Sequence, residues 1–160
     1  PADFIMVASM NPPKYSAAST QKIQRRISQP LLDRIDLTID VQPVPIEDLQ
    51  KKPDENAHSS ATILDRVVRA RERQVERFAS LSISTNKEMS VKEIDMLCPL
   101  DDTSAQILKM AVDRMGLSAR GYHRTIKVAR TIADLADSDN IAKEHVAEAL
   151  QYRQNISAED

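Results

Sequence analysis

Aromatic residues and glycine are scarce in this sequence of 160 residues. Aromatics make up 3%, with no tryptophan and two phenylalanines, and there are only two glycines. The scarcity of glycine excludes a fold that depends on many tight β-hairpins. The 41% of hydrophobic residues must therefore build a core mainly from Leu, Ile, Val, Ala and Met. This composition favours helices.

Cysteine is nearly absent as well. The single cysteine, Cys98, excludes an internal disulfide and has no metal-ligand spacing, so we expect a small buried apolar residue and no metal site. The net charge of −2 excludes a general attraction to nucleic acid or membrane. No hydrophobic run approaches the roughly 20 residues of a membrane span. We expect a cytoplasmic protein without membrane contact.

Two strand-like runs lie near the start of the chain. Residues 4–9 are a continuous apolar run, and residues 37–41 alternate with β-branched side chains. A buried strand at the very beginning leads us to expect that the chain is part of a longer protein. Three prolines (Pro43, Pro45 and Pro53) then predict a boundary, so we expect an α/β portion over residues 1–45 and a linker over 46–58.

Helix signals dominate the rest, residues 59–160. The predicted helix starts are Ser59 or Ser60, the Ser90–Glu93 capping box, Thr103, Ser118 and Lys143, and Gly116 is a predicted helix stop. The first helix should have Ile63, Val67, Ala70, Gln74 and Phe78 on its apolar face, and the helix from Ser118 should run to about Asp137. The predicted fold is mostly α, with a small α/β remnant followed by a helical bundle.

Asn11 is the first candidate functional residue, because it follows the strand-like run 4–9. Ligands bind at the carboxyl edge of open α/β sheets, and an Asn amide there can bond a terminal phosphate or the attacking water. An asparagine before a proline is also a common turn former, and spacing alone favours that interpretation.

Arg34 is the second candidate. It lies between Asp33 and Asp36, where a short helix meets the second strand-like run. An exposed guanidinium there can bind a neighbouring subunit's phosphate in a bidentate manner. The alternative is a local surface ion pair with an aspartate, worth about 0–1 kcal/mol.

A third candidate is the basic face at the start of the helix after Ser118. Arg120, Arg124 and Lys127 share one helix face, with Arg130 three residues further on. Arg120 lies in the first turn, where backbone N–H groups also favour anions. The face suits phosphate binding, and a solvated basic stripe is an equally good interpretation.

A second arginine stripe belongs to the first predicted helix. It comprises Arg66, Arg69, Arg73 and Arg77, and Glu72 and Glu76 beside it weaken its field. Without interleaved aromatic residues the stripe is only weak evidence for nucleic-acid binding.

Four runs together resemble the Mg-chelatase-like AAA+ ATPases of the YifB/ComM type. They are FIMVASMNP (4–12), RISQPLLDRIDL (26–37), LSARGYHRTIKVARTIADL (117–135) and HVAEALQYR (145–153). The runs occur in order over nearly the whole chain, so the set is more specific than any one of them. The resemblance implies that residues 1–45 are the C-terminal part of an AAA+ core and that residues 59–160 are its helical lid.

The resemblance also implies roles for single residues. Asn11 would be the sensor-1 residue, Arg34 the arginine finger acting in trans, and Arg120 the sensor-2 arginine acting in cis or in trans, with Arg124 as a further nucleotide-binding residue. ATP and Mg²⁺ would be held by a phosphate-binding loop upstream, because no G-x-x-x-x-G-K-[ST] occurs here. The chain alone should therefore not hydrolyse ATP, and the whole protein should assemble into a ring, as a hexamer.

One departure concerns a cysteine-rich insert that many relatives carry after the Asn-Pro. Residues 13–19 contain no cysteine, so no zinc site is expected there. Three functions stay open: ATP-driven remodelling of DNA of the branch-migration or helicase kind, Mg²⁺ insertion into a porphyrin, and a non-enzymatic helical interaction module.

Overall fold

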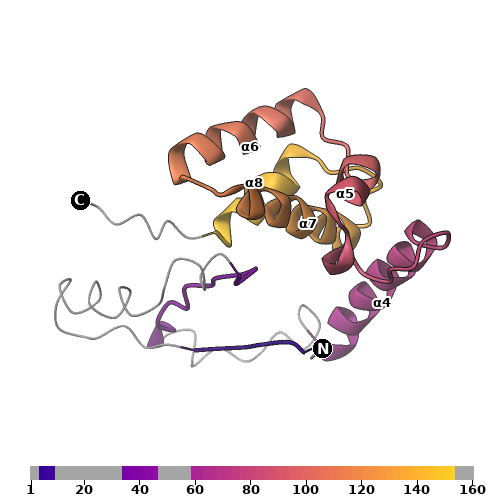
Figure 1. The fold of residues 1–160 in the computed structure, drawn as a ribbon. Helices are drawn as coiled ribbons and strands as arrows, with labels where there is room; N and C mark the ends of the chain where they lie inside the picture. The colour runs from indigo at the N-terminus through magenta and orange to yellow at the C-terminus, as the bar shows by residue number, and fades with distance from the viewer. Residues whose placement is uncertain (1–3, 10–33, 47–58, 154–160) are drawn as a thin grey trace. The chain divides into compact units, whose positions relative to one another are not determined.

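The computed structural model describes residues 4–9, 34–46 and 59–153 (Figure 1). The chain divides into two compact units, Pro1–Arg34 and Ile35–Asp160. All the helices described belong to the second unit. They are α4 (Ser60–Arg77), the 3-10 helix η1 (Asn86–Glu88), α5 (Val91–Leu97), α6 (Asp102–Met115), α7 (Ala119–Leu135) and α8 (Lys143–Gln151).

The two predicted strands are wrong within the described part of the chain. Residues 4–9 and 37–41 are not in strands, and the β-pairing described is one isolated parallel bridge between Leu100 and Ile141. Their apolar side chains are exposed, with Val7 at 90% and Val41 at 84%. A strand is stable only when its backbone pairs with neighbours in a sheet, and neither segment has such a ladder here. The α/β remnant is therefore not formed in these residues.

The helix starts and stops agree closely with the local signals. Ser59 Oγ caps α4 by accepting from Thr62 N at 3.2 Å, and Ser90 and Glu93 form the predicted capping box of α5. Helix α6 begins after Asp101, whose carboxylate accepts from Ser104 N at 2.7 Å, and ends at Gly116 with φ +60°. Because these caps satisfy backbone groups that a helix end leaves open, short-range sequence was enough to place them.

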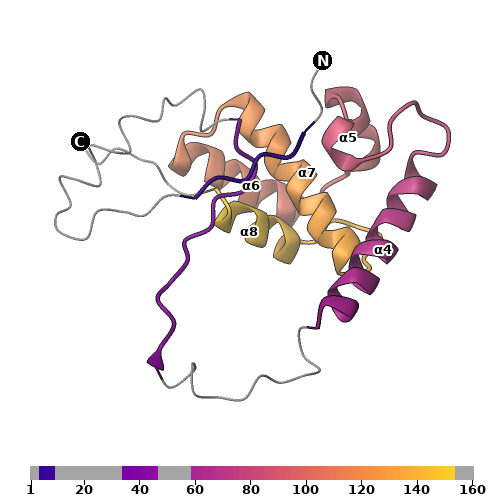
Figure 2. The same cartoon turned by 90° about the horizontal axis from the view of Figure 1, so that it is seen from below.

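Helix α7 is the centre of the helical unit (Figures 1 and 2). It packs against α4, η1, α5 and α8, and α8 also packs against α6. Its inner face carries the fully buried small residues Ala129 and Ala133, which let neighbouring helices approach closely. The core around them contains Leu108, Ile126 and Val146, and burial of each such side chain contributes about 1.5–3 kcal/mol.

Cys98 is buried in this core, as expected from the sequence. Burial raises the pKa of its thiol to about 11, and nearby arginines offset only part of that effect. At neutral pH the thiol is therefore protonated and unreactive, which is the behaviour of a packing residue.

Helix α4 is buried only along its C-terminal half. Ala70, Gln74 and Phe78 are buried, whereas Ile63 is 49% and Val67 42% exposed. The predicted apolar face thus continues past the point where α7 covers it. Figures 1 and 2 both show α4 at the edge of the helical unit.

A buried carboxylate joins α4, η1 and α7. Asp134 is 1% exposed and accepts hydrogen bonds from both terminal nitrogens of Arg77 and from Arg130 Nε at 3.1 Å. Asn86 of η1 donates to the same carboxylate at 2.8 Å and accepts from Arg77 at 3.0 Å. Arg130 also donates to the carbonyl oxygens of Ser138 and Asp139, at 2.6 and 2.8 Å. The two arginines thus share one acid, and Arg130 is also bonded to the carbonyls of the loop after α7.

Replacing Asp134 with alanine should cost about 3–5 kcal/mol of unfolding free energy, because two guanidinium groups then lose their buried counter-charge. Urea unfolding of this chain followed by circular dichroism measures the loss. Asp113→Ala in α6 is the matched control, since Asp113 is exposed and a surface change of this kind stays within about 0.5 kcal/mol. Equal unfolding curves for the two variants would contradict a structural role for the carboxylate.

The two glycines should respond to alanine in opposite directions. At Gly116 the φ of +60° strains an alanine, so Gly116→Ala should destabilise the chain by about 1 kcal/mol. At Gly121 an added Cβ meets its nearest atoms at 3.6 Å, which is ordinary contact, so Gly121→Ala should stabilise α7 by about 0.5–1 kcal/mol. Thermal melting of both variants is the measurement, and a loss of stability in Gly121→Ala would refute the helical first turn of α7.

Candidate nucleotide-sensing site

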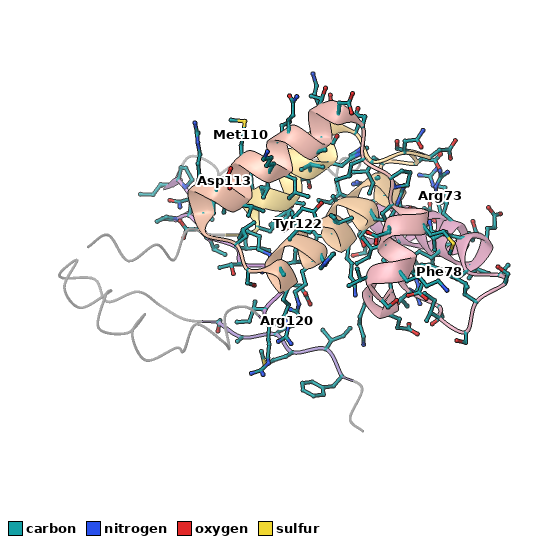
Figure 3. All side chains as sticks on the ribbon, turned by 45° about the horizontal axis from the view of Figure 1, so that its top comes forward. Arg73, Phe78, Met110, Asp113, Arg120 and Tyr122 are labelled. Carbon is teal, nitrogen blue, oxygen red and sulfur yellow. The ribbon has the colours of Figure 1, made fainter. Side chains whose placement is uncertain are left out.

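The start of α7 is fixed by a side-chain cap. Ser118 Oγ accepts from Gly121 N at 3.1 Å, and Ser118 O accepts from Tyr122 N at 2.9 Å. These bonds define the first turn, in which Arg120 is exposed. In Figure 3 Arg120 lies at the opposite end of α7 from the arginine-rich part of α4 around Arg73.

Arg120 makes no ion pair or side-chain hydrogen bond with the residues that the structure describes. Arg120 is the second residue of α7, close to the helix N-terminus, where the helix dipole and the unbonded N–H groups favour negative charge. A guanidinium binds phosphate in a bidentate manner. The arrangement can therefore recognise a phosphate group that approaches the start of α7.

Arg124, one turn further along α7, has a carboxylate partner. Its Nη1 donates to Asp36 Oδ1 at 2.8 Å, and the two side chains are 26% and 60% exposed. This ion pair gives the Arg124 side chain a partner within its own chain. It does not test the prediction that Arg124 binds nucleotide.

Lys127, which is half-buried, is the third cation of this face. Its Nζ donates to the carbonyl oxygen of Lys87 at 2.8 Å. Partial burial lowers the pKa of Lys127, the positive charge of Arg124 lowers it further, and Asp36 opposes the shift. Three cations thus lie on this face, and the carboxylate of Asp36 is bonded to one of them.

Arg130 does not belong to this face, contrary to the sequence prediction. It is 2% exposed and bonded to Asp134 and to the loop after α7. Ten residues after Arg120 the helix has turned this position towards the core. Its counter-ion Asp134 sits one turn later, and this i,i+4 spacing is a signal that the sequence contained.

Arg34 is exposed and is the last residue of the first unit. Asn11 and residues 13–19 lie outside the described residues, so the predictions on sensor 1 and on the missing zinc site stay predictions. Within residues 4–9, 34–46 and 59–153, no group of three His, Cys, Asp or Glu side chains is placed to hold a metal ion.

The arginine stripe of α4 separates into two pairs. Arg73 donates to Asp137 at 2.8 Å and also bonds Asp139, and Arg77 is held by Asp134. Arg66 and Arg69 are exposed and form no ion pair with the part of the chain that the structure describes. The sequence showed the stripe but not the acids that bind half of it, because they lie more than fifty residues away in the chain.

The helices of the described chain include none that is long and apolar enough to cross a bilayer.

Comparisons with known proteins match both halves of the chain. A family model described as "Magnesium chelatase, subunit ChlI C-terminal" matches residues 57–153, and one described as "Magnesium chelatase, subunit ChlI" matches residues 1–49. The competence protein ComM of Haemophilus influenzae is 41% identical over 163 residues, which cover 96% of this chain and 31% of that protein.

Two further relatives cover the same part. The YifB protein of Escherichia coli is 37% identical over 96% of this chain and 31% of its own length, and a Mycobacterium tuberculosis protein is 31% identical over 96% and 32%. The chain spans about a third of the length of these relatives. With the C-terminal model matching most of the helical unit and the relatives matching the chain nearly from end to end, the chain belongs to the Mg-chelatase-like family of the YifB/ComM type.

Proposed function

We propose that this chain is the C-terminal part of a ring-forming AAA+ ATPase and that its helical unit is the lid that senses bound nucleotide. The observation that carries the proposal is the state of Arg120. It is exposed beside a capped helix N-terminus without a carboxylate partner in the described residues, whereas Arg77 and Arg130 are neutralised within the fold. In this proposal Arg120 is the sensor-2 residue.

Arg34 and Asn11 are the other two residues of the proposed ATPase site. Asn11 reads the terminal phosphate or the attacking water, and Arg34 is the finger that stabilises the transferring phosphoryl group from a neighbouring subunit. The exposure of Arg34 supports such a role, because a finger must leave its own subunit's surface to reach a neighbour. A homo-oligomeric ring, with six subunits as the expected number, follows from a finger that acts in trans.

ATP and Mg²⁺ belong to the whole protein in this proposal. These 160 residues contain no phosphate-binding loop, so the loop and the acids for Mg²⁺ would lie in the remaining part of a full-length polypeptide. Phosphoryl transfer depends mainly on positioning and charge stabilisation. The residues of this chain supply the charge that responds to nucleotide, and the rest of the core supplies the binding pocket.

The substrate that we propose for remodelling is DNA, in a reaction of the branch-migration or helicase kind. The support is the exposed pair Arg66 and Arg69 on α4 and the likeness to a protein named for competence. Arg73 and Arg77 are engaged by aspartates, which narrows the proposed DNA contact to the N-terminal half of α4. The name of the family model favours a second candidate, Mg²⁺ insertion into a porphyrin.

Arg34→Ala in the full-length protein should lower the kcat for ATP by about 10³–10⁵, the loss expected for a missing arginine finger. Arg120→Ala should lower it by about 10², as for the loss of one charge-stabilising donor. Steady-state phosphate release measures both. Arg114→Ala in the last turn of α6 is the matched control, because Arg114 is also exposed and should leave turnover unchanged. Unchanged turnover in Arg34→Ala would remove the finger assignment.

Mixing the two variants tells whether the arginines serve the same ATP site from one subunit or from two. If Arg34 acts in trans and Arg120 in cis, an Arg34→Ala subunit next to an Arg120→Ala subunit regains one complete site. Mixed rings should then hydrolyse ATP faster than either variant alone. No recovery would place both arginines on the same side of the interface.

Forked DNA should raise ATP turnover by the full-length protein. An Arg66→Ala/Arg69→Ala double variant should lose most of that stimulation and reduce the salt slope of DNA binding by about 2, one for each phosphate contact removed. The control is Lys92→Ala/Lys109→Ala, which removes the same charge from exposed sites on α5 and α6. Turnover that ignores DNA but responds to a porphyrin with Mg²⁺ would instead support the chelatase candidate.

A further inference from the structure

The segment that follows Arg34 is attached to the helical unit at two points. Asp36 Oδ1 accepts from Arg124 Nη1 of α7 at 2.8 Å. Thr38 N donates to Tyr152 O, at the end of α8, at 2.9 Å. One contact is an ion pair and the other a backbone hydrogen bond, and they reach different helices. A segment held in this way follows the movement of the helices that hold it.

The ion pair is close in sequence to both proposed nucleotide-responsive arginines. Asp36 is two residues after Arg34, a chain distance of at most about 7 Å. Arg124 is four residues after Arg120 on the same rigid helix, a rise of about 6 Å. The Asp36–Arg124 pair therefore connects Arg34 to Arg120, because only a short stretch of chain separates each arginine from one partner of the pair.

The charges around Asp36 make it a suitable anchor. Besides Arg124, the carboxylate acts on Lys127, since it opposes the lowering of the lysine pKa. Arg124 and Lys127 lie on one face of α7, so the carboxylate of Asp36 offsets part of the repulsion between their two positive charges. The pair is partly exposed, so its side chains can adjust while the ion pair is kept as the helices move.

We propose that the Asp36–Arg124 ion pair is a strut, that is, a contact that holds the segment after Arg34 (residues 36–38) on the helical lid. In this proposal Arg124 is a positioning residue and not a phosphate ligand. The proposal rests on the proposed function, since Arg34 must be the finger and Arg120 must be the sensor acting in cis. When the lid of one subunit moves on its own ATP through Arg120, the strut carries residues 36–38 with α7. Arg34, which this subunit presents to its neighbour, then changes position according to the nucleotide that is bound to the subunit carrying Arg34.

The strut itself is tested on this chain without ATP. Hydrogen–deuterium exchange at the Thr38 amide, measured by NMR, should be slowed by its bond to Tyr152. In Asp36→Ala and in Arg124→Ala the exchange should become roughly two- to fivefold faster, the range that an exposed ion pair supports. The charge-reversed double variant Asp36→Arg/Arg124→Asp should restore the slow exchange.

Asp40→Ala is the control for this measurement. Asp40 lies in the same segment and is exposed, but its carboxylate accepts from Gln42, at 2.7 Å, within the segment itself. The Thr38 amide should exchange at the unaltered rate in this variant. If Asp36→Ala and Arg124→Ala also leave that rate unaltered, or if the reversed pair fails to restore it, the strut is overturned.

The effect on ATP turnover is tested in the full-length protein. Asp36→Ala and Arg124→Ala should each lower kcat by roughly tenfold to a hundredfold with little change in KM, because a displaced finger costs rate and not ATP binding. The reversed double variant should recover kcat. If Arg124 instead contacts ATP, Arg124→Ala raises KM, Asp36→Ala does not, and the reversed pair recovers nothing, which overturns the positioning role.

The two measurements separate the strut from the function on which it rests. In one outcome, slowed exchange at Thr38 depends on the pair but ATP turnover does not change in Arg34→Ala or Arg120→Ala. The strut would then remain as a structural contact without a role in catalysis. Turnover that depends on Arg34 and Arg120 but not on Asp36 or Arg124 would keep the ATPase and overturn the coupling.

Discussion

The buried carboxylate of Asp134 is the constraint on which the helical unit depends. It lies where α4, η1 and α7 meet, and it accepts from Arg77, Arg130 and Asn86. A buried charge is tolerated only when its hydrogen bonds are satisfied, so the cluster permits few alternative arrangements of the three elements. Since α7 also packs on α8, the rotation of α7 that brings Asp134 inward decides which of its side chains face outward. Arg120 is among those.

This constraint sorts the arginines of the chain into two kinds. Arg77 and Arg130 balance Asp134, and Arg73 balances the aspartates of the loop after α7, so their charge is used within the fold. Arg66 and Arg120 are exposed without an ion pair in the described residues. Net charge was a poor guide here, because a value of −2 conceals a few cations left available for anionic partners.

Local signals predicted the helices well, and the reason is physical. Ser59, Ser118 and Gly116 act on backbone groups within three or four residues, so the sequence around them contains all that the cap requires. The strand predictions for residues 4–9 and 37–41 failed because a strand is defined by a partner. A β-branched run states only that a segment suits a sheet, and the described residues offer these two runs no ladder.

The candidate site shows the same division between local and distant information. The place of Arg120 in the first turn of α7 followed from Ser118 alone, and the structure agrees. For Asp36 no signal in the sequence pointed to a distant partner, and its carboxylate bonds Arg124, 88 residues away. Ion pairs form between charged side chains that the fold brings close together, often from distant parts of the sequence. Their pairing is therefore hard to predict from the sequence alone. A surface ion pair contributes little to stability, and its importance here is that it connects two segments whose arginines are proposed to read nucleotide. A weak contact suits this proposed role, because side chains at the surface can adjust to a moving helix, whereas side chains packed in a core cannot.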